Sequence, residues 1–156
     1  MKATIIALNC VGWSTMQVLL ARSFLHVPDR LFQKRIWLPR EAEMWIYRRL
    51  LGVRYWKHWL PDGERWLRAS FSKKHLASHS AEHLEKFVLE TRRGEAVHWI
   101  AIACGFVFFA WNPREAWLTL LLVAAVLNLP CIVVQRYNRF RITGVLAWRG
   151  KERFRL

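Results

Sequence analysis

Residues 116–134, AWLTLLLVAAVLNLPCIVV, form the most continuous apolar run of the chain. A membrane-spanning α-helix needs about 20 such residues to cross the hydrocarbon core of a bilayer. A lipid-exposed segment finds no water for its peptide groups, so it must satisfy them within itself, as a helix does. The run therefore predicts a membrane-spanning helix and an all-α integral membrane protein.

Two further apolar stretches lie towards the N-terminus. Residues 96–111 are short and aromatic, and the tight turn that follows, residues 112–115 (NPRE), predicts an antiparallel hairpin over residues 96–134. Residues 3–21 are apolar apart from a few polar side chains. Lys2 gives this stretch the basic start of a signal peptide, but a poor cleavage site follows, so we interpret it as an uncleaved anchor. We expect three spans in a single membrane domain that covers the whole chain.

Composition and charge support a membrane location. The 156 residues are 54% hydrophobic, yet they carry a formal net charge of +14 and ten Trp, a residue that favours the membrane interface. Sixteen Lys and Arg fall within residues 22–95 and seven within residues 135–156, against two in the rest of the chain. The positive-inside rule therefore predicts that both segments are cytoplasmic and the N-terminus is outside. With spans present, anionic lipid headgroups or an anionic substrate are favoured as partners over nucleic acid.

The long cytoplasmic segment interleaves aromatic residues with Arg and Lys between Trp37 and Trp66. This composition is typical of short helices that lie in the headgroup plane, and a soluble mini-core built from the same Trp residues is the alternative. Further on, Ser80 is a good helix N-cap, with Glu82 in the first turn. The pattern predicts a helix that continues to His98.

The polar block that enters the second span, residues 90–99 (ETRRGEAVHW), contains the first candidate site. Ionisable groups at the rim of hydrocarbon lose hydration at a cost, which favours a functional role. On a helix Glu95 and His98 share a face, so the carboxylate can orient the imidazole of a general base. Glu90 lies about two turns before His98. The alternative is an interfacial helix end anchored by Trp99.

The third span and its exit contain a second set of polar residues. Asn128, Gln135 and Asn138 lie along one stripe of a helix, and we expect Asn128 to face the interior of the bundle. Hydrogen bonding between helices is the alternative role of such a stripe. The exit adds three arginines that either reach lipid phosphates or bind substrate: Arg136, Arg139 and Arg141.

The tight hairpin predicts that the two polar blocks return to the same side of the membrane. Because packed helices lie 8 to 10 Å apart, we expect His98 within about 10 Å of a side chain at the exit of the third span. The candidates at that exit are Gln135, Arg136, Asn138 and Arg139. Arg92 and Arg93, in the first block, are either salt-bridge partners of its carboxylates or a clamp for a phosphate or carboxylate.

Two patterns are weaker. Residues 79–83 (HSAEH) have the spacing of one class of zinc peptidase, and with His75 one turn earlier they would support a metal-dependent membrane hydrolase. Because the predicted helix begins inside this pattern, its first His turns away from the shared face, and we expect no bound metal. His58 and Asp62 are one residue short of the spacing used by many glycerolipid acyltransferases. A non-catalytic membrane subunit that binds anionic lipid or a partner helix is a further alternative.

Four groups of residues carry a family resemblance: Trp56-Lys57-His58 with Asp62-Gly63; Glu90-Thr91-Arg92-Arg93 with Glu95 and His98-Trp99; Asn128-Leu129-Pro130; and Gln135-Arg136-Tyr137-Asn138-Arg139 with Arg141. In this order and spacing they resemble the glycosyl-4,4'-diaponeurosporenoate acyltransferases, from about Val27 to Arg141. The resemblance implies a multi-pass enzyme of the bacterial cell membrane. Such an enzyme esterifies a sugar hydroxyl of a glycosylated carotenoid, or of a similar glycolipid, with a fatty acyl group.

The resemblance and the residues together lead to a mechanism. We expect His98, oriented by Glu95, to take the proton of the attacking hydroxyl on the cytoplasmic side. Glu90 is a further candidate catalytic residue, and Asp62 is a candidate for substrate binding. Donors to the developing oxyanion are expected from the facing helix: Asn128, Gln135, Arg136 and Asn138. Four arginines are expected to hold the acidic part of a donor such as an acyl-coenzyme A thioester: Arg92, Arg93, Arg139 and Arg141. The partners are then membrane lipids, a lipid-linked sugar acceptor and a fatty acyl donor, with no metal or redox cofactor required.

Overall fold

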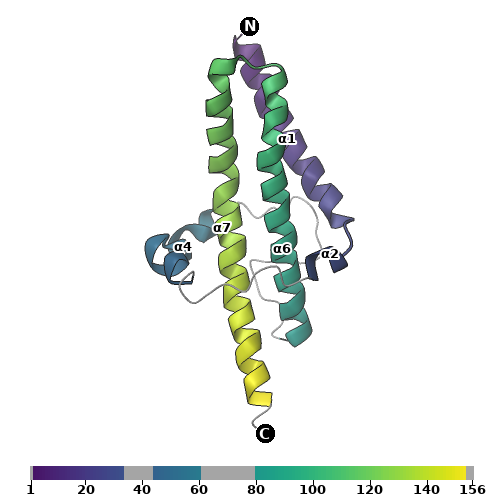
Figure 1. Ribbon diagram of the computed structural model, residues 1–156, viewed down its shortest axis with the longest axis vertical. Helices are drawn as coiled ribbons and strands as arrows, with labels where there is room; N and C mark the ends of the chain where they lie inside the picture. Colours follow the sequence, from purple (N-terminus) through teal and green to yellow (C-terminus); the bar gives the residue numbers. More distant parts are fainter. Residues whose placement is uncertain (1, 34–43, 61–79, 154–156) are drawn as a thin grey trace. The chain divides into compact units, whose positions relative to one another are not determined.

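The computed structural model describes residues 2–33, 44–60 and 80–153, and every regular element in these ranges is a helix (Figure 1). Three of them are long: α1 (Lys2–Leu25), α6 (Ala81–Cys104) and α7 (Arg114–Arg153). The short elements are α2 (Arg30–Gln33), the π-helical turn η1 (Ile46–Leu50), α4 (Val53–Trp56), and the 3₁₀ helices η2 (Lys57–Trp59) and η3 (Gly105–Ala110). The prediction of an all-α membrane protein is confirmed.

Three helical stretches are long and apolar enough to cross a membrane: Ala3–Leu25, Ala81–Ala110 and Arg114–Trp148. Their number matches the prediction, but their bounds are wider. The helix of the second span begins at Ala81, and the third continues well beyond residue 134, so the tail predicted from residue 135 is helical as far as Arg153. At 1.5 Å per residue, the 40 residues of α7 extend about 60 Å, twice the thickness of the hydrocarbon core. The helix therefore has to continue outside the hydrocarbon.

Two predicted helix boundaries are confirmed. The Ser80 hydroxyl accepts a hydrogen bond from the backbone N–H of His83 at 3.2 Å, as an N-cap does, and α6 follows directly. At the hairpin, η3 ends at Ala110 and α7 begins at Arg114, one residue after Pro113. Proline is well placed there, because its ring fixes the backbone for a helix start and it lacks an N–H that would need a partner.

The chain divides into two compact units, each made of segments far apart in the sequence. The first unit comprises residues 1–27 and 94–132, and the second comprises residues 28–93 and 133–156. Helices α6 and α7 each contribute residues to both units.

Small residues let the helices of the first unit approach closely. A Cβ added to Gly12 of α1 would lie 3.3 Å from the Phe108 ring, and one added to Gly105 would lie 3.5 Å from the Cβ of Ala124 on α7. Close approach through small residues is typical of helices packed in membranes. The outer surface is aliphatic, with Val11 66% and Val126 68% exposed, as expected of side chains that face lipid.

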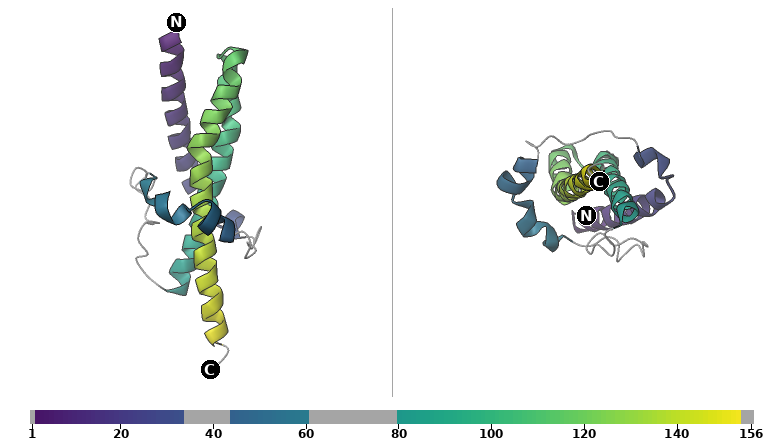
Figure 2. Two further views of the ribbon diagram at one scale, coloured as in Figure 1. Left: turned by 90° about the vertical axis from the view of Figure 1, so that its left-hand side faces the viewer. Right: turned by 90° about the horizontal axis from the view of Figure 1, so that it is seen from below.

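The second unit has its own apolar core where the first half of α6 packs against the last part of α7. Leu84, Phe87 and Val88 of α6 lie with Ile142 of α7, and Leu146 packs against them. Figures 1 and 2 show α2 and α4 on opposite sides of this helix pair.

Residues 44–60 add a short, partly packed segment to the second unit. Tyr47 lies against Phe140 of α7, with ring centroids 5.3 Å apart, and Val53 is fully buried. Trp45 and Trp59 are instead 60% and 79% exposed, as expected of interfacial anchors. Residues 44–60 therefore combine packed side chains, as in the mini-core interpretation, with exposed Trp side chains, as in the interfacial interpretation. Trp37 and Trp66 lie outside the described residues.

Candidate functional site

A chain of hydrogen bonds links three helices in the first unit. Asn128 of α7 is fully buried, and its side-chain Oδ1 lies 2.9 Å from Nδ1 of His98 on α6. The same Oδ1 accepts a hydrogen bond from Nε2 of Gln17 on α1 at 3.0 Å. The predicted inward orientation of Asn128 is confirmed. Its position brings one residue of the predicted polar stripe into direct contact with the predicted base.

The direction of these hydrogen bonds follows from the chemistry of the groups. The Asn128 Nδ2 donates to the backbone carbonyl of Ala124 at 2.9 Å, and a carbonyl can only accept, so the orientation of the Asn128 amide is defined. Its Oδ1 is then the acceptor facing His98, and His98 must donate through Nδ1–H. In the neutral imidazole this tautomer carries the lone pair on Nε2, the atom that can accept a proton.

Glu95 forms a hydrogen bond within α6, and its predicted pairing with His98 stays a prediction. Its carboxylate accepts from Nε1 of Trp99 at 3.3 Å, one helical turn along α6. The residue hydrogen-bonded to Nδ1 of His98 is Asn128, which comes from the other arm of the hairpin. Asn128 therefore holds the Nδ1 side of the imidazole.

A second amide cluster in the same unit lies at the hairpin turn. Asn9 of α1 and Asn112 exchange hydrogen bonds at 2.9 and 3.0 Å, and Asn9 also accepts from Nε1 of Trp111. Asn112 further donates to the backbone of Phe108 at 2.8 Å. These residues join α1 to the turn, which is the structural role expected of amides between membrane helices.

Arg92 and Arg93 have internal partners in the second unit. Arg93 is 8% exposed and forms ion pairs with Glu90, one turn earlier on α6, and with Asp29 just before α2. Arg92 donates to the backbone carbonyls of Phe32 and Gln33 at 2.8 and 3.0 Å. Of the two predicted interpretations, the geometry favours salt bridging for Arg93. It also gives Glu90 a structural partner.

The block at the exit of the third span lies in the second unit. The Gln135 Oε1 is buried and has no hydrogen-bond partner among the described residues. The Asn138 Oδ1 accepts from Nζ of Lys57 at 3.4 Å. Arg136 and Arg139 are half-buried, and Arg141 is exposed. The predicted approach of His98 to this block joins residues of two different units and stays a prediction. Asp62 lies outside the described residues.

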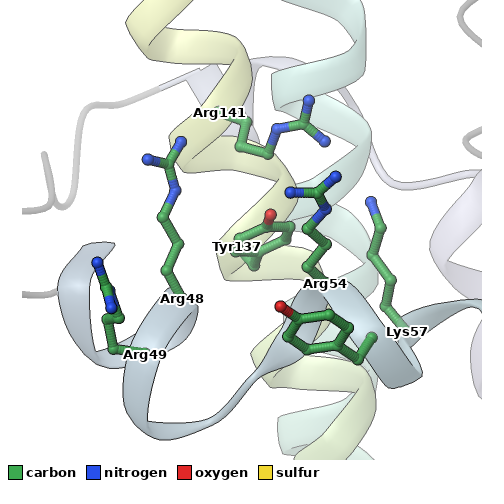
Figure 3. Close-up of a pocket in the computed structure, with 7 residues that line it drawn as sticks. Arg48, Arg49, Arg54, Lys57, Tyr137 and Arg141 are labelled. Atoms are coloured by element: carbon green, nitrogen blue, oxygen red, sulfur yellow. The ribbon is translucent and has the colours of Figure 1, made fainter.

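A basic pocket in the second unit was not anticipated from the sequence. It has a volume of about 760 Å³ and is lined by Arg48, Arg49, Arg54, Tyr55, Lys57, Tyr137 and Arg141 (Figure 3). Only Arg141 belonged to the predicted set. The available signal was the alternation of Arg, Lys and Tyr over residues 48–57, which we interpreted as an interfacial pattern.

Burial and charge affect Lys57 in this pocket. Its Nζ lies 5.3 Å from the centre of the Tyr137 ring, and the Arg141 guanidinium lies 5.9 Å from the same ring. Burial, and then repulsion by Arg141, lower the pKa of Lys57 from its ordinary value of 10.5.

The zinc pattern falls largely outside the described residues. His75 and His79 lie there, whereas Glu82 and His83 belong to the first turn of α6. Within the described ranges no group of three or more His, Cys, Asp or Glu side chains is arranged to hold a metal ion.

Comparison with known proteins identifies the family. A family model described as glycosyl-4,4'-diaponeurosporenoate acyltransferase matches residues 28–147. The protein of that name from Staphylococcus aureus strain bovine RF122 / ET3-1 is 31% identical over 140 residues, which cover 86% of this chain and 83% of the relative. The protein of that name from strain USA300 is 30% identical over 138 residues, with the same coverage. No solved structure matches the chain. The chain therefore belongs to the glycosyl-4,4'-diaponeurosporenoate acyltransferase family and is an acyltransferase with membrane-spanning helices.

Proposed function

We propose that the protein transfers a fatty acyl group to a hydroxyl of a lipid-linked sugar, with His98 as general base. The observation that carries this proposal is the hydrogen bond of His98 to the fully buried Asn128 within an apolar helical unit. The names of the relatives support a glycosylated carotenoid as the acceptor. A similar glycolipid would present the same hydroxyl chemistry.

The tautomer of His98 suits this role. A sugar hydroxyl is a poor nucleophile at neutral pH, so His98 Nε2 takes its proton as the oxygen attacks the acyl carbonyl carbon. The imidazolium that forms keeps its Nδ1–H bonded to Asn128, whose oxygen stabilises the charge without itself being ionised. When the tetrahedral intermediate collapses, the leaving group departs with that proton and the ester is released.

The acyl donor in this scheme is a thioester such as acyl-coenzyme A. The thiolate leaves from the acyl carbon and takes the proton held by His98, so both the atoms and the charges balance without a further reactant. Stabilisation of the oxyanion by Arg136 or Asn138 stays a prediction. Gln135 offers a buried acceptor to a hydroxyl of the substrate.

We further propose that the reaction takes place on the cytoplasmic side of the bacterial cell membrane. The support is the excess of basic residues in the segments 22–95 and 135–156, which the positive-inside rule assigns to the cytoplasm. The second span supplies His98 and the third supplies Asn128. A lipid-linked acceptor and an acyl chain would reach the site from the bilayer.

The test is replacement of His98 by Ala, with the product measured by mass spectrometry of extracted lipids. Loss of a general base lowers the rate by about 10² to 10⁴, so the acylated product should fall to background while the protein stays folded in the membrane. His83→Ala is the matched control, because it removes another imidazole from the same helix. Normal product from a well-folded His98→Ala variant would exclude the proposed role of His98. Loss of product in the His83 variant, together with co-purified zinc, would favour the hydrolase alternative.

A further inference from the structure

The basic pocket is formed by three elements of the second unit. The turn η1 carries Arg48 and Arg49, the segment 53–59 carries Arg54 and Lys57, and α7 carries Arg141. Between the first two elements Gly52 has φ = +53°, a left-handed conformation that glycine adopts without a steric penalty. Basic residues on both sides of this turn line one cavity. Figure 3 shows the Arg48, Arg54 and Lys57 side chains around Tyr137 and Arg141.

The charged residues described in the lining of the pocket are all basic. Five of its seven described lining residues are cationic, two are Tyr, and none is acidic. Among the described residues, no carboxylate pairs with Arg48, Arg49, Arg54 or Arg141, in contrast to Arg93. Burial is the main cause of the lowered pKa of Lys57, and repulsion by Arg141, the second cause, reflects the same crowding of positive charge. Like charges held around one cavity repel each other, and an anion relieves that repulsion.

The size and the side-chain types narrow the choice of anion. A volume of about 760 Å³ falls in the usual range for small-molecule sites, roughly 300 to 1,000 Å³, and exceeds what one phosphate group needs. Arginine forks match phosphate oxygens in a bidentate geometry, and four of the five cations are arginines. Tyr55 also lines this pocket and is 74% exposed, so its aromatic ring is accessible to a ligand.

We propose that this pocket binds the phosphate groups of a ligand, and that the ligand is the coenzyme A portion of the acyl donor. The second part of the statement rests on the proposed acyl transfer. The same phosphate chemistry is available from an anionic lipid headgroup, so the experiment separates the two sources. In this proposal the pocket residues hold the acidic part of the donor, the role predicted for Arg92 and Arg93. The guanidinium groups of those two residues bind groups of the protein itself.

The experiment measures binding of coenzyme A to the purified full-length protein by titration calorimetry. Replacement of Arg54 or Arg141 by Gln should weaken binding about tenfold or more, the loss expected for a charge-assisted hydrogen bond. The double variant should abolish measurable binding. Arg30→Gln is the matched control, since it removes the same charge from an exposed position of the same unit that does not line the pocket. Pantetheine, which lacks the phosphates, should not bind.

A second arm uses nanodiscs that contain either phosphatidylglycerol or phosphatidylcholine. One result supports phosphate binding but not coenzyme A as the ligand. In that result coenzyme A does not bind, the original protein prefers phosphatidylglycerol, and the pocket variants lose this preference, so the bound phosphate belongs to a lipid. If pantetheine binds as tightly as coenzyme A, or if the pocket variants match Arg30→Gln in both arms, the proposal is overturned.

The outcome is independent of the assignment of His98. A His98→Ala variant should still bind coenzyme A with unchanged Kd, because His98 does not line the pocket. If that variant keeps acyl transfer while Arg54→Gln loses binding, the proposed base is wrong and the pocket is right. If His98→Ala loses acyl transfer while Arg54→Gln still binds coenzyme A normally, the proposed base is right and the proposed pocket is wrong.

Discussion

The two compact units bury polar groups in different ways. In the first, hydrogen bonds that link the helices join amide side chains and an imidazole: Asn9, Gln17, Asn128 and His98. In the second, Arg93 is 8% exposed and forms ion pairs with two carboxylates. A charge at the centre of a bilayer is expensive, whereas an amide that finds a partner is tolerated. The paired amides of the first unit are therefore compatible with a lipid surrounding, whereas the ion pairs of the second unit are better suited to a more polar one.

The comparison also separates residues with a structural role from residues available for chemistry. Asn9 and Asn112 satisfy each other in a closed pair, and Arg93 is held by Glu90 and Asp29. Asn128 and the pocket arginines differ from these, because the first orients an imidazole and the others face a cavity. This distinction can be tested by mutating residues of both kinds and comparing the effects on stability and activity.

The largest effect is expected for Asn128→Ala. It removes the acceptor of His98 Nδ1–H, so the tautomer and orientation of the imidazole are lost, and acyl transfer should fall about a hundredfold. Stability should fall by about 2 kcal/mol, because two donors lose their partner. Product formation and thermal unfolding of the purified protein measure the two effects. Asn9→Ala is the control, with a similar loss of stability and near-normal activity. Equal loss of activity in both variants would mean that Asn128 acts only in packing.

The next largest effect is expected for the buried ion pairs of Arg93 in the second unit. Arg93→Met leaves the Glu90 and Asp29 carboxylates without their partner, and we expect a loss of about 2 kcal/mol in stability. This loss of stability is smaller than for a fully buried ion pair, because the Asp29 side chain is 55% exposed and stays hydrated. Arg30→Met serves as the control, at an exposed position. Unchanged thermal unfolding of Arg93→Met, together with a loss of coenzyme A binding, would restore the ligand-clamp interpretation of Arg93.

A smaller effect is expected for Gln17→Leu. The Asn128 Oδ1 keeps its hydrogen bond with His98 when Gln17 is removed, so activity should stay within about threefold of the original while stability falls by about 1 kcal/mol. Initial rates and unfolding midpoints check both values. A loss of activity as large as that of Asn128→Ala would show that α1 contributes directly to the reaction.

The smallest effect is the pH dependence contributed by Lys57. Its pKa is lowered in the folded protein, so its positive charge opposes folding at neutral pH, and this cost disappears as the pH rises from the folded pKa towards 10.5. Stability relative to Lys57→Met should therefore increase as the pH is raised through that window. Unfolding midpoints of the two proteins at pH 7 and pH 10 measure the difference. A change of the opposite sign would mean that an anionic group holds Lys57 in its charged form.

Much of the fold followed from local patterns. The apolar run at 116–134, the turn before Arg114 and the Ser80 cap were predicted correctly, because hydropathy, turn chemistry and capping involve neighbouring residues. The bounds of the spans were less well predicted. The helix continues to Arg153, although the sequence after residue 134 is no longer continuously apolar, so the apolar pattern alone did not predict this extension.

The sequence by itself also pointed to some of the residues suited to chemistry, among them His98, Asn128 and Arg141. Only the tertiary structure decided their partners. Asn128 lies 30 residues from His98 and 111 from Gln17, so their hydrogen bonds depend on how three helices pack. Likewise, Arg92-Arg93 and Arg48-Arg49 are the same dipeptide, but the first pair binds carbonyls and carboxylates and the second lines a pocket. The physical reason is that helix formation is a local property of the chain, whereas hydrogen bonds, ion pairs and cavities depend on groups that folding brings together.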